Sequence, residues 1–339
     1  RLNQFLRLRQ NGLQQYANDD PLYYDNDLKI YDPATPLAGN FDNNSSVFKT
    51  YNNIEPRINI SYSFNNQSIK ASYNRLNQYL HLISNTSSPT PLDIWVPSGP
   101  YIKPQKLDQY ALGYYKRIKK IKIETEIFYK KIKNRLDYID GADLVANDNI
   151  ETVILPGKSR AYGFEILLKK SEGRHKFMVA YTLSKSEQKT PGRNSLEDGI
   201  NFSNWYNTPY DKPHDFSINS EYILSKKLKI VGNFIYQTGQ PTNYPNSQYT
   251  YMNLNVPNYG KRNSQRLPNY HRMDINLTLT PEKKNKKIES SWVFGIYNLY
   301  DRDNASSIIF RRNNETLKNE AVQISIFGIV PSVTYNFKF

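Results

Sequence analysis

The chain alternates apolar and polar residues in short stretches that recur along its length. Its last nine residues, PSVTYNFKF, carry Val333, Tyr335, Phe337 and Phe339 on one side and polar or charged residues on the other. Because successive side chains of a strand point to opposite faces, this period of two predicts a β-strand with one apolar face. A membrane barrel would turn such a face toward lipid, whereas a soluble protein would bury it under a second sheet.

The same period predicts twelve strands in all. The first is the N-terminal stretch RLNQFLRLRQ, and the last is the closing stretch. Between them the alternation predicts five pairs of strands, at residues 58–64 and 69–73, 110–114 and 121–129, 162–168 and 177–183, 216–224 and 230–236, and 273–279 and 290–300.

The connections between these strands are alternately short and long. Short turns are expected near residues 66, 119, 173, 226 and 284. Long segments rich in Asn, Asp, Pro, Gly and Ser lie at residues 11–50, 84–104, 139–158, 188–211, 244–268 and 302–321. Outer-membrane barrels have short periplasmic turns and longer extracellular loops. The pattern therefore favours such a barrel over a large soluble β-protein, with the turns and Arg1 on the periplasmic side.

Polar residues occupy the strand faces opposite the apolar ones. Arg57 and Asn59 flank Ile58, and Arg272 and Asp274 flank Met273. Unpaired charges of this kind are costly in a dry core, which favours a water-filled interior.

Composition narrows the possible classes further. No run of 18 apolar residues occurs, which excludes a membrane-spanning helix. The chain has no Cys, so disulfides and thiolate metal sites are excluded. The net charge of +14 could indicate a nucleic acid partner. The basic clusters at residues 115–122, 225–229 and 281–287 lie between strands without a nucleic-acid-binding motif, so we expect no such partner.

Residues suited to catalysis or metal binding are sparse. The histidines have no partner at helical spacing, and no nucleophile-elbow, phosphate-loop or zinc-protease motif occurs. The pair His214 and Asp215 is expected to be structural. The acidic stretch 19–27 could hold calcium, but it lacks the spacing of an EF-hand loop, so a solvated loop is favoured. We predict no enzymatic activity, no catalytic residues, no metal and no cofactor.

Aromatic residues of the long loops are better binding candidates. Trp95 and Tyr101 lie in PLDIWVPSGPYIKP, and Trp205 and Tyr206 lie in INFSNWYNTPY. Aromatic side chains on loops frequently anchor sugars, peptides and proteins. For each of them, packing of one loop against its neighbour is the alternative.

Several stretches together resemble a known family. They include DIWVPSGPYIKPQKLDQYALGYY, SRAYGFEILLKK, INFSNWYNTPYDKPHDFS, RLPNYHRMDINLTL and VFGIYNLYDRDNASSIIF. In this order and spacing they resemble the C-terminal half of the barrel of TonB-dependent outer-membrane receptors, and they look most like those of the Bacteroidota. The resemblance runs from about residue 50 to Phe339. It implies a 22-stranded barrel that is closed by an N-terminal plug and powered by the TonB system.

The expected fold class is all-β, a transmembrane antiparallel up-and-down β-barrel. Residues 1–339 would form the C-terminal part of one barrel domain, with about twelve of the 22 strands, while the plug and the N-terminal strands are absent. A closed twelve-stranded barrel is the second possibility.

The expected function is that of an outer-membrane receptor and transporter, in which extracellular loops capture a ligand and import is energised through the plug. The alternative is a non-transporting scaffold subunit of a multi-protein outer-membrane complex for secretion or assembly. Expected partners are outer-membrane lipid and lipopolysaccharide, the TonB system, outer-membrane lipoproteins and the barrel-assembly machinery. The resemblance implies that this machinery reads a C-terminal signal formed by Val333, Tyr335, Phe337 and Phe339.

Overall fold

The structure is a computed structural model of the chain. It describes residues 1–8, 15–16, 19–37, 47–83, 93–144, 147, 149–252, 254–281, 289–313, 315 and 319–338. Within these residues, no helix has both the length and the apolar character needed to cross a membrane.

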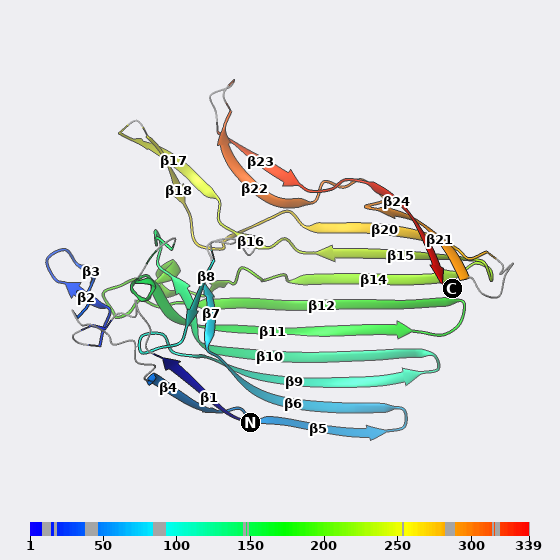
Figure 1. Cartoon of the computed structure of the whole chain (residues 1–339), viewed down its shortest axis with the longest axis horizontal. Coiled ribbons are helices and arrows are strands. Elements are labelled where there is room, and N and C mark those ends of the chain that lie inside the picture. The colour runs from blue at the N-terminus through cyan, green and yellow to red at the C-terminus, as the bar shows by residue number, and fades with distance from the viewer. Residues whose placement is uncertain are drawn as a thin grey trace.

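A single antiparallel sheet of twelve strands dominates the fold (Figure 1). Eleven of them follow one another across the sheet in sequence order, with β5 at one edge and β24 at the other, and the short β13 pairs with β12. They are β5 (Arg57–Phe64), β6 (Gln67–Gln78), β9 (Gln105–Ile118), β10 (Ile121–Tyr138), β11 (Ile154–Lys170), β12 (His175–Lys189), β13 (Tyr206–Asn207), β14 (His214–Ile223), β15 (Leu228–Gln237), β20 (Tyr270–Leu279), β21 (Glu289–Tyr297) and β24 (Val330–Lys338). This up-and-down antiparallel order confirms the predicted fold class. In the described part of the chain the two edges do not pair with each other, so the structure does not form the closed twelve-stranded barrel.

The short and long connections lie at opposite ends of the sheet (Figure 1). The hairpin between β5 and β6 turns at Asn65 and Asn66, whose φ angles of 42° and 60° fit a primed two-residue turn. The turns after β9, β11 and β14 also lie where the sequence predicts them. The fifth predicted turn, near residue 284, falls on residues outside the described ranges.

Further strands lie outside the main sheet, most of them in the long connections. The sequence analysis predicted the N-terminal one and missed the others. Together they form two-stranded sheets: β1 (Leu2–Leu8) with β4 (Val47–Ile54), β2 (Leu22–Asp25) with β3 (Ile30–Pro33), β7 (Leu80–Ile83) with β8 (Ile94–Pro97), β16 (Pro241–Thr242) with β19 (Gln265–Arg266), β17 (Pro245–Tyr251) with β18 (Leu254–Tyr259), and β22 (Ala305–Arg312) with β23 (Asn319–Ser325). Two short 3₁₀ helices, η1 (Ile150–Thr152) and η2 (Ile200–Ser203), complete them.

The first predicted strand is placed differently from the prediction. β1 does not join the main sheet but pairs with β4, from Leu2 opposite Ile54 onward. The Glu55 N–H donates to the Arg1 carbonyl oxygen at 2.8 Å, so Arg1 lies at the loop end of β5 and not at the turn end. The prediction failed because β4 reads VFKTYNNI, which lacks strict alternation and therefore hid the partner of β1.

The buried core lies among the loops and not across the sheet. One cluster contains Ile83, Val96, Ile102, Leu144, Ile150 and Ile154, and a second contains Leu155, Ile200 and Tyr206. The sheet itself leaves outward residues such as Ile60 and Tyr62 about two-thirds exposed, at 66% and 68%. This is the arrangement expected where one face meets lipid and the other meets water.

Candidate ligand site at the loop end

A cavity of about 370 Å³ opens at the loop end of the sheet. Its lining comes from β7, from the end of β10, and from the long connections that follow β12, β15 and β18. Among its lining residues are Arg135, Asp137, Gln188, Tyr210 and Arg262. Apart from Arg135 and Asp137, which are both on β10, these residues are far apart in the sequence and are brought together by the folding of the loops.

A β-bulge aims the end of β10 into this cavity. The pairing of β10 with β11 shifts between Lys133 and Arg135, and Asn134 takes a left-handed φ of 55°. An extra residue in one strand moves the following side chains to the other face. Asp137 therefore points inward, although strict alternation would place it on the same face as Lys133.

Arg262 fixes the connection after β18 onto the end of β10. Its guanidinium donates to Asp137 Oδ1 at 2.6 Å, to the Tyr138 carbonyl oxygen at 2.8 Å and to the Asp140 carboxylate. The guanidinium also lies 4.4 Å from the centre of the Tyr138 ring, at a residue exposure of 8%. Burial alone would lower the pKa of Arg262, but the attraction of Asp137 and Asp140 raises it, so the cation is firmly held.

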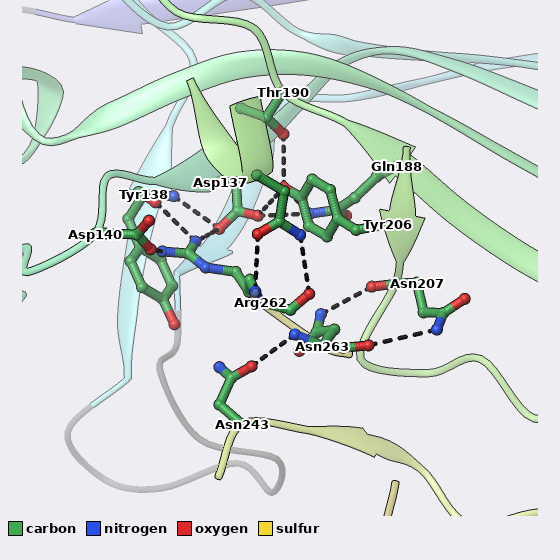
Figure 2. A network of polar contacts seen from close by, with 11 residues as sticks. Asp137, Tyr138, Asp140, Gln188, Thr190, Tyr206, Asn207, Asn243, Arg262 and Asn263 are labelled. Carbon is green, nitrogen blue, oxygen red and sulfur yellow. Dashed lines mark hydrogen bonds and ion pairs between the residues drawn. The ribbon is translucent and has the colours of Figure 1, made fainter. Parts of the chain in front are cut away.

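Tyr206 completes the hydrogen bonding of Asp137 (Figure 2). Its hydroxyl donates to Asp137 Oδ2 at 2.5 Å and accepts a bond from Gln188 Nε2 at 2.8 Å. A further contact of 2.8 Å joins this hydroxyl to Thr190 Oγ1. Burial and the Asp137 carboxylate raise the pKa of Tyr206, so the phenol stays protonated. Gln188 Oε1 is buried with no partner among the described residues, which leaves one acceptor available at the cavity wall.

Asparagines extend the network along the loops. The Asn201 side chain accepts a bond from the Arg262 N–H at 2.8 Å and donates back to the Arg262 carbonyl oxygen at 3.0 Å. Asn263 donates through its side chain to the Asn207 carbonyl oxygen at 2.8 Å and through its N–H to Asn243 Oδ1 at 2.6 Å (Figure 2). Three separate connections are thereby held as one rigid platform.

The four aromatic loop candidates do not share one site. Trp95 lies on β8 and is 59% exposed, whereas Tyr101 packs edge-to-face on Tyr16 at 5.3 Å. The Arg160 guanidinium carbon lies over the Trp205 ring, 4.2 Å from the ring centre. Tyr206 is buried and packs against Leu155 and Ile200 in the second core cluster. Trp205 and Tyr206 are therefore adjacent in sequence but lie in different surroundings.

At the C-terminus, Val333, Tyr335 and Phe337 lie on one exposed face of β24, opposite Phe294, Trp292 and Ser290 of β21. Phe339 lies outside the described residues.

The acidic stretch 19–27 uses its carboxylates locally. Asp25 Oδ1 accepts the backbone N–H groups of Asp27 and Leu28 at 2.8 and 3.0 Å, and Asp20 Oδ1 accepts that of Leu22 at 3.1 Å. Within the described ranges, no cluster of three or more His, Asp or Glu side chains has a metal-binding arrangement.

The sequence analysis missed Asp137, Gln188 and Arg262 altogether. The stretch GKRNSQR, which holds Arg262, sits in a predicted loop without any distinctive spacing. Its partner Asp137 lies 125 residues earlier, so only the folded loops reveal the pair.

The chain belongs to the family of TonB-dependent receptor-like β-barrels, because the model of that family matches residues 10–299. Members of this family are outer-membrane β-barrel proteins, and the chain is a multi-pass strand segment of such a barrel. Comparison with curated protein sequences found no match.

Solved structures share the fold at low sequence identity. The ferric-catecholate import receptor Fiu from Escherichia coli K12 is similar with a TM-score of 0.53 and 17% identity, over 91% of this chain and 37% of Fiu. The siderophore receptor PiuA from Acinetobacter baumannii gives 0.57 and 15%, over 89% and 38% of the two chains. The ferripyoverdine receptor of the outer membrane of Pseudomonas aeruginosa gives 0.53 and 13%, over 90% and 34%. The chain thus spans a little over a third of the length of these receptors.

Proposed function

We propose that this chain is the C-terminal barrel segment of a TonB-dependent receptor, of the Bacteroidota type, that captures a ligand at its loop end for import. The platform built on Asp137 and Arg262 is the observation that carries the proposal. The groups that support a binding site must be fixed in position. Here hydrogen bonds join three connections into one network, which Figure 2 shows. Transport also requires a plug and the TonB system, which belong to the proposal by analogy with the longer receptors.

The ligand proposed for this cavity is a polar small molecule. Gln188 Oε1 offers a buried acceptor, Tyr210 offers a phenol, and the charges of Asp137 and Arg262 are already matched to each other. The three similar proteins are a ferric-catecholate import receptor, a siderophore receptor and a ferripyoverdine receptor, so small iron chelates are the first compounds to test.

A growth experiment tests this function. Cells that lack the gene of the full-length receptor would be grown with ferric chelates, glycans or peptides as the limiting nutrient. We expect one class to require the receptor and an intact TonB system. The double variant Tyr210→Ala Asn243→Ala should fail to restore growth, and Tyr251→Ala, on the exposed hairpin of β17, should restore it fully. Purification with stoichiometric protein partners and without any TonB-dependent uptake would instead establish the scaffold role.

The C-terminal face is proposed as the assembly signal. Val333, Tyr335 and Phe337 lie in one exposed row on the edge strand β24, which pairs only with β21 in the described part of the sheet. An edge strand has free backbone groups that another protein can pair with. We expect Tyr335→Ser Phe337→Ser to reduce the amount of folded barrel in the membrane, and Tyr249→Ser Tyr251→Ser, exposed on a loop hairpin, to leave it unchanged.

A further inference from the structure

A row of lysines lies on the outward face of the sheet at its loop end. In the strand register, Lys106 of β9 is opposite Lys133 of β10, Lys133 is opposite Lys158 of β11, and Lys158 is opposite Lys189 of β12. We call these four residues the lysine ladder. The register of β9 to β12 is uninterrupted from the ladder to the turn end, so the ladder lies on the same face as Ile127, the tyrosines and the other apolar residues of these strands.

A row of tyrosines on the same face indicates where the membrane ends. Tyr73, Tyr110, Tyr129 and Tyr162 are opposite one another on β6, β9, β10 and β11. Tyrosine belts of this kind lie at the boundary between lipid and water. Toward the turns the outward residues are mostly apolar, such as Leu112, Ile127 and Phe164, and toward the loops they are mostly charged. The ladder lies four residues beyond the tyrosines, about 13 Å along the strand and less in height because barrel strands tilt.

The carboxylates near the ladder form their ion pairs with other cations. Between the ladder and the tyrosines, Asp108 pairs with Arg75 at 2.6 Å, and Glu187 pairs with Arg160 and with Lys185. No ion pair is formed by a ladder lysine within the described residues, and Lys133 and Lys158 are exposed. Like charges directly opposite each other destabilise a sheet. A bound anion would relieve the repulsion among these four residues.

We propose that the lysine ladder binds the phosphorylated headgroup of an outer-leaflet lipid, the class to which lipopolysaccharide belongs. Three observations favour a lipid over a soluble anion: the site lies on the lipid-facing side of the sheet, it lies just beyond the tyrosine row, and Trp205 flanks it. Lys158 and Arg160 lie 5.8 and 4.2 Å from the Trp205 ring centre. An ammonium group on a long flexible stem can reach phosphate while its methylenes lie on apolar surface.

A lipid-retention experiment tests the proposal. The full-length receptor, purified in mild detergent, would be incubated with bisphosphorylated lipid A, and bound lipid would be counted by native mass spectrometry. We expect Lys106→Gln Lys133→Gln Lys158→Gln to lower retention by about tenfold or more, since each basic residue near an anionic surface contributes several-fold to binding.

The chain offers a matched control with the same loss of charge. Arg117, Lys122 and Lys169 are opposite one another in the same three strands, but on the inward face at the turn end. The triple variant with Gln at these positions should retain lipid A as the unmodified protein does.

Three outcomes would overturn the proposal. Equal retention by the ladder variant and the control would show that the ladder is not the site. Displacement of lipid A by millimolar inorganic phosphate would indicate a site for free phosphate. Loss of an acidic protein from the purified receptor, with lipid retention unchanged, would assign the ladder to a protein partner. Both variants should still fold as heat-modifiable barrels, which separates these results from a general failure of the receptor.

Discussion

Two groups of charged residues at the loop end of the sheet differ in how their charges are compensated. On the inward face, the buried Arg262 is bonded to Asp137 and Asp140, so that its charge is matched. On the outward face, Lys133 and Lys158 are exposed and opposite each other, without a carboxylate between them. Asn134, next to Lys133, is the bulge that separates the two arrangements. Matched charges fix the shape of the loops, whereas unmatched charges remain available for a partner.

Removing Arg262 should produce the largest effect. Arg262→Ala leaves Asp137 buried without its cation, and breaking a buried ion pair costs about 3–5 kcal/mol. We expect the connections after β12 and β18 to become sensitive to protease while the strands stay protected. We also expect the variant to lose import. Limited proteolysis with mass spectrometry would measure this.

The exposed pair of Arg311 and Glu320 supplies the control for that change. Its atoms are 2.8 Å apart, but the Arg311 side chain is 62% exposed, so Arg311→Ala should change stability by less than about 1 kcal/mol. Equal protease sensitivity of the two variants would contradict the inference that the ion pairs of Arg262 fix the loop conformation.

Removing one hydroxyl from the inward network should have a smaller effect. Tyr206→Phe deletes the donor to Asp137 and the acceptor of Gln188 Nε2, at a cost of about 1–2 kcal/mol. Hydrogen exchange at β13 should quicken, and the amides of β10 below the bulge should not change. Tyr251→Phe, on an exposed loop strand, is the matched control. An unchanged exchange rate in Tyr206→Phe would remove Tyr206 from the supporting network.

At the loop end, the buried side chain of His81 on β7 is kept in its neutral form. His81 Nδ1 accepts from Gln105 Nε2 at 3.0 Å, so Nε2 carries the proton and donates to Ser98 Oγ at 2.9 Å. Burial, helped by the cation of Arg135, lowers the pKa of His81 to about 4. The unfolded state takes up a proton first, near pH 6.5, so the stabilising effect is complete above that pH and is lost as the pH falls toward 4.

We expect β7 and β8 to lose on the order of 1 kcal/mol of local stability between pH 7 and pH 5, measured by hydrogen exchange corrected for its own pH dependence. His81→Asn should abolish this pH dependence, and His175→Gln, at an exposed site, should retain it. A flat profile in the unmodified protein would show that His81 is not the titrating group.

The sheet could be predicted from local sequence because each strand is recognisable from the alternation of apolar and polar residues within it. β10 and β11 pair over many residues, and their apolar face was already evident from Ile123 and Phe164. The loop platform was not predictable in this way. A single bulge at Asn134 reverses the face of Asp137, and the partner of that residue, Arg262, is remote in sequence. β1 likewise depends on β4, whose residues do not alternate.

Introducing an acid into the ladder should produce the smallest change in stability and the sharpest test of the comparison. Lys133→Glu would place a carboxylate directly opposite both Lys106 and Lys158, replacing two repulsive cross-strand pairs with attractive ones. We expect the free energy of unfolding, measured in urea in lipid vesicles, to rise by about 0.5 kcal/mol. Retention of lipid A should fall at the same time.

Lys122→Glu makes the equivalent change on the inward face, opposite Arg117 and Lys169, and should give the same small gain in stability without any loss of lipid. Stability and lipid binding would then move in opposite directions only on the outward face. If Lys133→Glu instead lowered both the stability of the barrel and its retention of lipid, the ladder lysines would be contributing to the fold. The contrast between the two faces would then not hold.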